Sequence, residues 1–189
     1  MSEFSMTPSP ALNGFARDYD GIVLHEITDR AIVSMATPNG GDVELNKAIS
    51  SVYKTDWPQM GASTISPVDD AVFLGLQSDQ IFVIFTPSSQ SPADEVAKKL
   101  SSVAYLTDQT DSWVMIEVSG PRCRKALERI CPIDLHADAF PKGKVARTAM
   151  EHMAAIIFHQ APDRFILISP RSSAKSFLHA LETSALNIS

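Results

Sequence analysis

The sequence predicts an α+β protein made of two successive ββαβββα-like units. Short runs rich in Val, Ile and Phe alternate with segments whose apolar residues recur at helical spacing. The order of these segments occurs twice along the chain, and matching landmarks lie 82 or 83 residues apart, as for Ala31 with Trp113 and Phe82 with Phe165. Strands of this kind, covered on one side by helices, are typical of an α+β domain.

The first unit is expected over residues 21–103. It begins with a strand at 21–27 and a second at 31–36, followed by a turn and a helix. Three more strands are expected at 62–66, 71–76 and 80–85, and Pro92 then begins another helix with Ser91 as its N-cap. The two helices have one apolar stripe each, made of Leu45, Ala48, Ile49 and Val52 in the first and Ala93, Val96, Ala97, Leu100 and Val103 in the second.

The second unit is expected over residues 104–189 and repeats this order. After a strand that overlaps 102–108, strands are predicted at 113–118, 145–150, 153–158 and 164–169. A helix from Pro121 to Pro132 buries one stripe, and the last helix buries another; the members are Cys123, Ala126, Leu127, Ile130 and Cys131, then Ala174, Phe177, Leu178 and Leu181. A single unit of about 80 residues buries little apolar surface, so we expect the two units to pack into one compact domain. Residues 1–20 are expected to form a flexible N-terminal arm.

Composition and charge exclude several classes of protein. The 189 residues are 44% hydrophobic and 20% charged, with a net charge of −6, which gives no reason to expect nucleic acid or an anionic membrane as partner. No apolar run is long enough for a membrane span, and the first residues do not resemble a signal peptide. We therefore expect a soluble, cytoplasmic protein.

The charge is distributed unevenly. Residues 1–103 carry 6 basic and 13 acidic side chains, whereas residues 120–175 carry 10 basic and 5 acidic ones. A basic region on an acidic protein is either a set of solvated helix faces or a surface for an acidic partner. The candidate partner or anion contacts in this region are Arg122, Arg124, Lys125, Arg129, Arg147 and Arg171.

The stretch GPRCRKALERICPIDLH, residues 120–136, contains both cysteines. Cys123 and Cys131 are eight residues apart on the predicted helix, which corresponds to about 12 Å along its axis. That separation is too long for a disulfide and does not suit a shared zinc ion. We interpret both cysteines as small core residues, with the basic side chains on the solvent side of the helix.

The sequence contains no motif for catalysis or for a resident cofactor. The five histidines form no metal-binding motif, no Ser or Cys lies in a nucleophile motif, and no glycine-rich nucleotide loop is present. Arg147 in a strand and Arg171 at the start of the last helix are the best candidates for an anion, because arginine pairs bidentately with carboxylate or phosphate. The simpler explanation of both residues is an internal structural ion pair or a partner contact.

From Thr107 onward the chain resembles the gamma subunit of heterotetrameric sarcosine oxidase. The segments that carry the resemblance are TDQTDSWVMIEVSGPRCRKALERICPIDLH, AFPKGKVART and DRFILISPRSSAKSFLHAL. Such subunits are distant relatives of the folate-binding domain of glycine-cleavage aminomethyltransferases. The resemblance therefore implies a fold like that domain, itself a duplication of similar units.

The resemblance also implies a function. The chain would be a non-catalytic gamma subunit, without catalytic, cofactor-binding or metal-binding residues of its own, in an oxidoreductase complex with alpha, beta and delta subunits. That complex demethylates sarcosine to glycine, and its FAD, FMN, NAD, zinc and tetrahydrofolate belong to the other subunits. The large alpha flavoprotein would be the main partner.

Three alternatives stay open. The chain could be a subunit of a related N-methyl amino acid dehydrogenase, a stand-alone tetrahydrofolate-binding C1-transfer protein, or a generic protein-interaction module. A folate site requires a cavity with a carboxylate for the pterin ring, and Glu117, which alternates with apolar neighbours in its strand, is the one candidate on the predicted strands.

Overall fold

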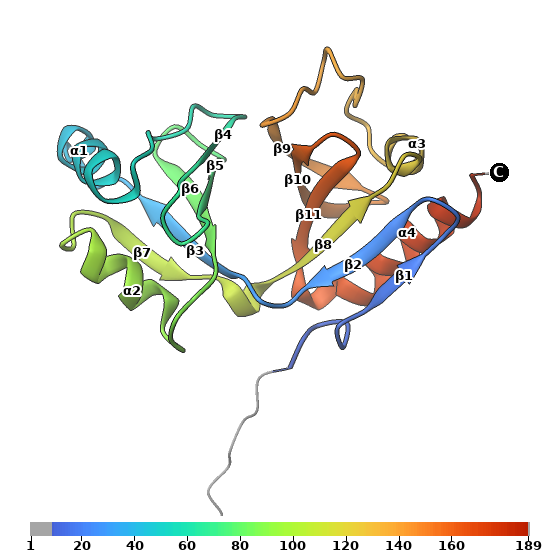
Figure 1. Cartoon of the computed structure of the whole chain (residues 1–189), viewed down its shortest axis with the longest axis horizontal. Coiled ribbons are helices and arrows are strands. Elements are labelled where there is room, and N and C mark those ends of the chain that lie inside the picture. The colour runs from blue at the N-terminus through green and yellow to red at the C-terminus, as the bar shows by residue number, and fades with distance from the viewer. Residues whose placement is uncertain (1–8, 189) are drawn as a thin grey trace, which may run out of the picture.

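The computed structural model describes residues 9–188, which form two antiparallel sheets with helices on their outer sides (Figure 1). The predicted strands at 31–36, 80–85 and 145–150 are confirmed with the same bounds. The elements are β1 (Ala16–Asp18), β2 (Val23–Ile27), β3 (Ala31–Ala36), α1 (Asp42–Tyr53), β4 (Ser63–Ile65), β5 (Val72–Gly75), β6 (Gln80–Phe85), α2 (Pro92–Lys99), β7 (Tyr105–Asp108), the 3₁₀ helix η1 (Thr110–Ser112), β8 (Trp113–Ser119), α3 (Cys123–Glu128), β9 (Val145–Met150), β10 (Met153–Ala161), β11 (Arg164–Pro170), the 3₁₀ helix η2 (Arg171–Ser173) and α4 (Ala174–Leu186).

The two sheets share one strand order. The five-stranded sheet runs β4-β5-β6-β3-β7 and the six-stranded sheet runs β9-β10-β11-β8-β2-β1, with all neighbours antiparallel. β2 precedes β3 in the chain but pairs with β8, and β7 precedes β8 but pairs with β3. Each half of the chain therefore contributes one strand to the sheet of the other half.

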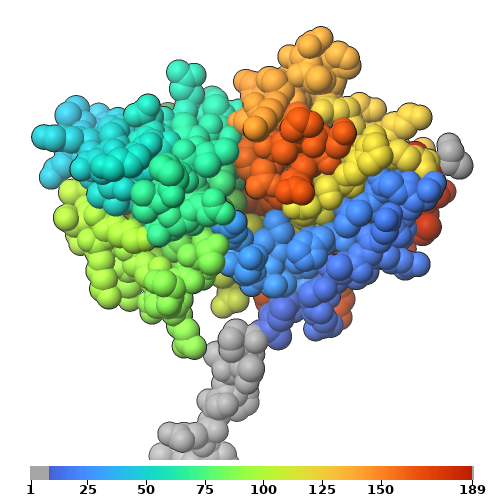
Figure 2. All heavy atoms as spheres, viewed as in Figure 1, coloured from blue at the N-terminus to red at the C-terminus, as the bar shows by residue number. Residues whose placement is uncertain are grey.

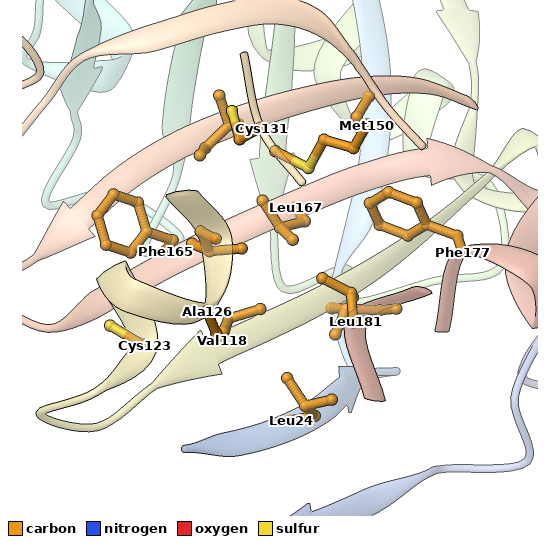
Figure 3. Packing of buried hydrophobic residues seen from close by; sticks show 14 of the residues in the cluster. Leu24, Val118, Cys123, Ala126, Cys131, Met150, Phe165, Leu167, Phe177 and Leu181 are labelled. Carbon is orange, nitrogen blue, oxygen red and sulfur yellow. The ribbon is translucent and has the colours of Figure 1, made fainter. Parts of the chain in front are cut away.

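The helices cover the outer face of each sheet. α1 and α2 pack on the five-stranded sheet around Leu45, Ile49 and Val96. α3 and α4 pack on the six-stranded sheet, where Phe177 and Leu181 lie against Leu167 and its neighbours (Figure 3). Completely burying a Phe or Leu side chain stabilises the fold by about 1.5–3 kcal/mol, so these apolar stripes are what fix the helices on the sheets.

The inner faces of the two sheets pack against each other. Ile32 and Phe82 of the five-stranded sheet share a buried cluster with Ile156, Phe158 and Ile168 of the six-stranded sheet. Strand residues alternate between faces, so one set in each strand enters this inner core and the other enters a helix-covered core. The layers are therefore helices, sheet, sheet and helices.

The sheets are also hydrogen-bonded to each other at one edge. The Ser63 N–H donates to the Gly143 carbonyl at 2.8 Å, and the Val145 N–H donates to the Gly61 carbonyl at 3.0 Å. These bonds join the start of β9 to the segment just before and at the start of β4. Beyond Val145, the outer edge of β9 makes no further backbone hydrogen bond to this segment within the described residues.

The N-terminal segment differs from the expected flexible arm over residues 9–20. This part contains β1 and the buried Leu12 and Tyr19. The buried Glu26 carboxylate accepts hydrogen bonds from the N–H groups of Leu12 at 2.9 Å and Gly14 at 2.7 Å. A buried carboxylate needs such donors, which explains why this segment is held. Residues 1–8 of the expected arm lie outside the described residues.

Helix α3 is shorter than the predicted helix from Pro121 to Pro132, because it spans only Cys123–Glu128. The chain continues in hydrogen-bonded turns, with the Cys131 N–H donating to the Leu127 carbonyl at 2.8 Å. A residue before proline is disfavoured in the helical region, so the helix cannot continue through Cys131 to Pro132, and residues 129–130 form turns. The prediction that both cysteines lie on one helix was wrong, although both are buried in the core as expected.

The predicted N-cap role of Ser91 is also absent. Ser91 occupies the N-cap position of α2, and Pro92 is the first residue of the helix as predicted, but the serine side chain makes no capping hydrogen bond. Instead the Glu95 carboxylate of the first helical turn accepts from the Ser88 N–H at 3.0 and 3.1 Å. The strand end and the helix start are thus joined by the glutamate rather than the serine.

Candidate functional site

A cleft of about 380 Å³ opens between the inner faces of the two sheets, at the end where the inner core gives way to polar side chains. The crease between the two sheets is visible on the face shown in Figure 2. The lining residues are His25, Ile27, Met115, Glu117, Phe158, Gln160, Arg164 and Ile166 on the six-stranded sheet, and Asp29, Arg30, Ile65, Asp70, Val72 and Ile84 on the other side.

Strand register places the polar residues of the cleft together. His25 of β2 is paired with Glu117 of β8, and Glu117 is paired with Ile166 of β11. Directly paired residues point to the same face of a sheet, so these three side chains form a row that Phe158 continues. Arg164, two residues before Ile166, faces the same side.

The carboxylate of Glu117 and the guanidinium of Arg164 form the central ion pair of the cleft. Arg164 Nε lies 3.6 Å from Glu117 Oε1, and the side chains are 50% and 20% exposed. A half-exposed pair at this distance contributes at most about 1 kcal/mol. Both groups therefore keep hydrogen-bonding capacity for a ligand, with Glu117 accepting and Arg164 donating.

The opposite side of the cleft combines an apolar wall with a second ion pair. Arg30 donates from Nη1 to the Asp70 carbonyl at 3.0 Å and from Nη2 to its carboxylate at 3.1 Å. Ile65, Val72 and Ile84 supply the apolar surface. The arrangement suits a flat molecule whose one face packs on aliphatic side chains and whose edge carries hydrogen-bond donors and acceptors.

The sequence identified Glu117 but missed Arg164 and Arg30. Arg164 precedes the apolar run of its strand and reads as an ordinary strand end. Its place beside Glu117 depends on the register of β11 against β8, which no pattern within either strand encodes.

The six basic candidate residues do not converge on one site. Arg122 is tied to the fold, because Nη1 contacts the Asp20 carboxylate at 2.7 Å and Nη2 donates to the Ile188 carbonyl. The Arg124 guanidinium lies over the Phe165 ring, 5.1 Å from its centroid. Arg171 donates to the Ser9 carbonyl at 2.5 Å. Three of the six therefore make internal contacts.

The other three candidates are exposed. Lys125 and Arg129 lie on or just after α3, and Arg147 lies on β9. None of them takes part in an ion pair among residues 9–188. Arg147 and Arg171 were singled out as the best candidates for an anion, and the structure places them in different elements with no shared partner.

One buried histidine was not anticipated by the sequence. His159 of β10 is 4% exposed, and its Nδ1 lies 2.9 Å from the Phe140 carbonyl. Because a carbonyl only accepts, Nδ1 carries the proton. The ring stacks on Phe165 with centroids 4.5 Å apart, so His159 holds the loop before β9 against the core.

Burial makes both cysteines poor nucleophiles. It raises the pKa of the Cys123 thiol to about 11, with a further contribution from the charge of Asp163. Burial also raises the pKa of Cys131. A thiol reacts as its thiolate, so neither side chain is activated. No group of three or more His, Cys, Asp or Glu side chains within residues 9–188 is arranged to hold a metal ion.

No helix formed by the part of the chain that the structure describes is both long and apolar enough to cross a lipid bilayer.

Comparison with known proteins gives three kinds of match. The family model for the GCVT N-terminal domain matches residues 52–161. The chain is 22% identical to the sarcosine oxidase subunit gamma of Corynebacterium sp. (strain P-1) over 71% of its length and 23% identical to that of an Arthrobacter species over 72%. The aligned region spans 66% of the length of each relative.

Two solved structures share the fold. A chain of heterotetrameric sarcosine oxidase from Corynebacterium sp. U-96, in complex with pyrrole 2-carboxylate, matches with a TM-score of 0.76 and 15% identity, covering 89% of this chain and 86% of the other. The glycine cleavage system aminomethyltransferase T from Bartonella henselae matches with a TM-score of 0.62 and 14% identity, covering 84% and 44%. These matches establish the arrangement of two antiparallel sheets with helices as a known fold.

Proposed function

Because this chain belongs to the family of the GCVT N-terminal domain and is homologous to sarcosine oxidase gamma subunits, we propose that it is the gamma subunit of a sarcosine-oxidase-type heterotetrameric flavoenzyme. In this proposal the complex oxidatively demethylates sarcosine to glycine. The chain itself is a non-catalytic accessory subunit, and its partners are the large alpha flavoprotein together with beta and delta subunits.

The observation that carries the proposal is the fold match to a chain of heterotetrameric sarcosine oxidase. That match covers nearly the whole of both chains, unlike the match to the aminomethyltransferase, which covers 44% of the larger protein.

The proposal assigns the cofactors to the other subunits. FAD, FMN, NAD, zinc and tetrahydrofolate would be held outside this chain. The exposed cations Lys125, Arg129 and Arg147 would contact partner subunits, because none of them is used in an ion pair within the described fold.

Co-expression with the three partner subunits from the same source tests the proposal. We expect the tagged chain to recover the flavoprotein in a 1:1 ratio through size-exclusion chromatography, with the flavin absorbance and sarcosine-dependent hydrogen peroxide formation in the same peak. A tagged chain that elutes alone, while the remaining subunits assemble and oxidise sarcosine at the full rate, would contradict the proposal.

A second candidate function, tetrahydrofolate binding by this chain, is favoured by the cleft between the sheets. Glu117 faces into that cleft beside Arg164, and aliphatic side chains form the opposite wall. A carboxylate that accepts from the donor edge of a pterin ring, with an apolar surface for its face, is what such a ligand requires. The volume of about 380 Å³ lies within the range of small-molecule sites.

Calorimetric titration of the isolated chain with tetrahydrofolate tests this second function. Saturable binding in the micromolar range, weakened about tenfold or more by Glu117→Gln, would support it, since a hydrogen bond to a charged group contributes about 1.5–3 kcal/mol. Glu44→Gln on the exposed surface of α1 is the matched control. Absence of binding at millimolar ligand would leave only the accessory role.

We also propose that the fold arose by duplication of a ββαβββα unit, with residues 21–103 and 104–189 as its two copies in one domain. The common strand order of the two sheets supports this proposal, as does the spacing of 82 or 83 residues between matching landmarks.

A further inference from the structure

The outer edge of β9 is an open sheet edge that carries positive charge. β9 is the last strand of the six-stranded sheet, and its partner β10 occupies only one of its sides. An unpaired edge presents backbone N–H and C=O groups that can pair with another strand. Sheet edges are used in this way to bind extended segments of partner proteins.

The hydrogen bonds at the start of β9 reveal which backbone groups face outward. The Val145 N–H donates to Gly61 on the side away from β10, whereas the Lys144 carbonyl accepts from the His159 N–H on the β10 side. Backbone groups alternate in direction along a strand. The N–H and C=O groups of Arg147 and Ala149 therefore point outward, beyond the short contact with Gly61–Ser63.

The side chains along this edge are basic and unpaired. Residues 139–150 include Lys142, Lys144 and Arg147 and no acidic side chain. All three cations are exposed, and they appear in none of the ion pairs or side-chain hydrogen bonds formed within residues 9–188. Lys144 and Arg147 lie on opposite faces of the strand because their positions differ by an odd number. The edge is thus flanked by positive charge on both faces.

Met60 adds an apolar contact at the same edge. This side chain is 71% exposed and adjoins Gly61, whose carbonyl accepts from Val145.

The other three sheet edges are less suited to this role. β1 and β4 have three residues each and β7 has four, compared with six in β9. Arg17 of β1 is held by Glu182 at 3.8 Å and lies over the Tyr19 ring. β7 carries Asp108 and no cation.

We propose that β9 is extended by a strand from a partner subunit whose segment carries carboxylate side chains. The occupant is inferred from charge complementarity, because three unpaired cations flank an edge with free outward amides. This inference rests on the proposed function for the existence of a partner subunit, and it adds the surface and the chemistry of the contact. Positive charge on an edge strand also discourages self-association, and the experiment separates that role from docking.

Two variants isolate the two components of the contact. The double substitution Lys144→Glu and Arg147→Glu reverses the charge and leaves the backbone edge intact. Ala149→Pro removes one outward N–H, while all the bonds to β10 remain because the Ala149 N–H does not face that strand. Lys175→Glu, at an exposed position on α4, is the matched charge control. The melting temperature of each isolated variant checks that it is folded.

The measurement is affinity for the co-expressed flavoprotein complex, together with hydrogen exchange of the chain alone and in the complex. We expect association to weaken about tenfold or more in the charge-reversed variant and in Ala149→Pro, but not in Lys175→Glu. The amides of Arg147 and Ala149 should exchange rapidly in the isolated chain and become protected in the complex. If Ala149→Pro does not fold, protection of these two amides still decides the question.

Each outcome distinguishes this inference from the proposed function. A complex that forms equally well with both edge variants, or without protection of Arg147 and Ala149, overturns strand addition alone. Increased self-association of the charge-reversed variant with unchanged complex affinity shows that the cations only guard the edge, which also overturns it. A wild-type chain that assembles with none of the subunits overturns the proposed function and this inference together.

Discussion

At the scale of single residues, Gly120 links two distant turns of the six-stranded sheet. Its φ of +106° is a backbone conformation that residues with a side chain rarely adopt, and a Cβ atom there would lie 2.4 Å from the Gly21 carbonyl oxygen. The Arg122 N–H donates to the same carbonyl at 3.3 Å. The glycine of the G-P pair thus permits the turn after β8 to approach the turn before β2.

Replacing Gly120 with Ala is expected to destabilise the protein by about 2–4 kcal/mol, because the new methyl group adds a backbone clash to the strained φ. Urea unfolding of the full chain measures this loss. Gly40→Ala is the control, because Gly40 also has a positive φ but a Cβ there meets nothing within 4 Å. Equal losses for the two variants would show that the contact with Gly21 contributes nothing.

The buried Cys123 thiol makes stability depend on alkaline pH. Its pKa of about 11 in the folded chain, raised by burial and then by Asp163, exceeds the value of about 8.5 for an exposed thiol. The folded state therefore holds this proton more tightly, and the resulting stabilisation is present below about pH 8.5 and disappears as the pH rises through 11.

We expect the free energy of unfolding to fall between pH 8 and pH 10.5 by about 2 kcal/mol more in the wild type than in Cys123→Ala. Urea titrations of both proteins at the two pH values provide the test. Other groups with raised pKa, such as Tyr19, affect both proteins equally and cancel in the comparison. A parallel decline in both proteins would exclude a contribution from this thiol.

At the scale of elements, α3 depends on its contact with α4. A helix of six residues is too short to be stable by itself. Ala126 and Leu127 are buried against the sheet and α4, and the Ser184 hydroxyl donates to the Ala126 carbonyl at 2.7 Å inside this contact. The Ala126 carbonyl also accepts from the Arg129 N–H, but at 3.4 Å, so the serine supplies its shorter hydrogen bond near the end of the helix.

Ser184→Ala is expected to cost about 1–2 kcal/mol of stability, because the buried Ala126 carbonyl loses its side-chain donor. Thermal unfolding and hydrogen exchange of α3 amides measure the effect, and α3 should exchange faster than the strands. Thr183→Ala, at the exposed neighbouring position, should change stability by less than about 0.5 kcal/mol. Unchanged exchange in α3 would show that the helix does not depend on this bond.

The elements that the sequence predicted best are those with local signals. β3, β6 and β9 coincide with short segments of mainly apolar or β-branched residues between turn residues. The end of α3 was misplaced because the apolar spacing continues to Cys131, whereas the helix ends at Glu128 and is followed by hydrogen-bonded turns. Glu26 gave no sign of burial, since its donors come from a segment 12 and 14 residues earlier.

The cleft could be predicted only in part, for a related reason. Alternation within one strand pointed to Glu117 as an inward carboxylate. The position of Arg164 depends on strand register, and the apolar wall opposite depends on how two sheets pack. The sequence could not separate the exposed basic candidates of the α3 region from those held by internal contacts. Arg122 and Arg124 contact Asp20, Ile188 and Phe165, and these partners lie far away in the sequence.

At the scale of the whole molecule, the exchange of β2 and β7 makes the two halves interdependent. Residues 104–188 lack β2, which forms five register pairs with β8, and residues 9–103 lack β7, which forms four with β3. Separation would also expose the inner core shared by the two sheets. Half-domains of this size bury too little apolar surface to compensate.

We therefore expect fragments 9–103 and 104–188 to be unfolded or aggregated when expressed separately, and to recover a folded 1:1 complex when refolded together. Near-ultraviolet circular dichroism and dispersed amide NMR signals identify the native packing, and sedimentation gives the stoichiometry. The recovered complex should unfold cooperatively, with a midpoint that rises with concentration because folding and association are coupled. A fragment that unfolds cooperatively alone, with most of the stability of the intact chain, would mean that the exchanged strand and the inner core stabilise that half little.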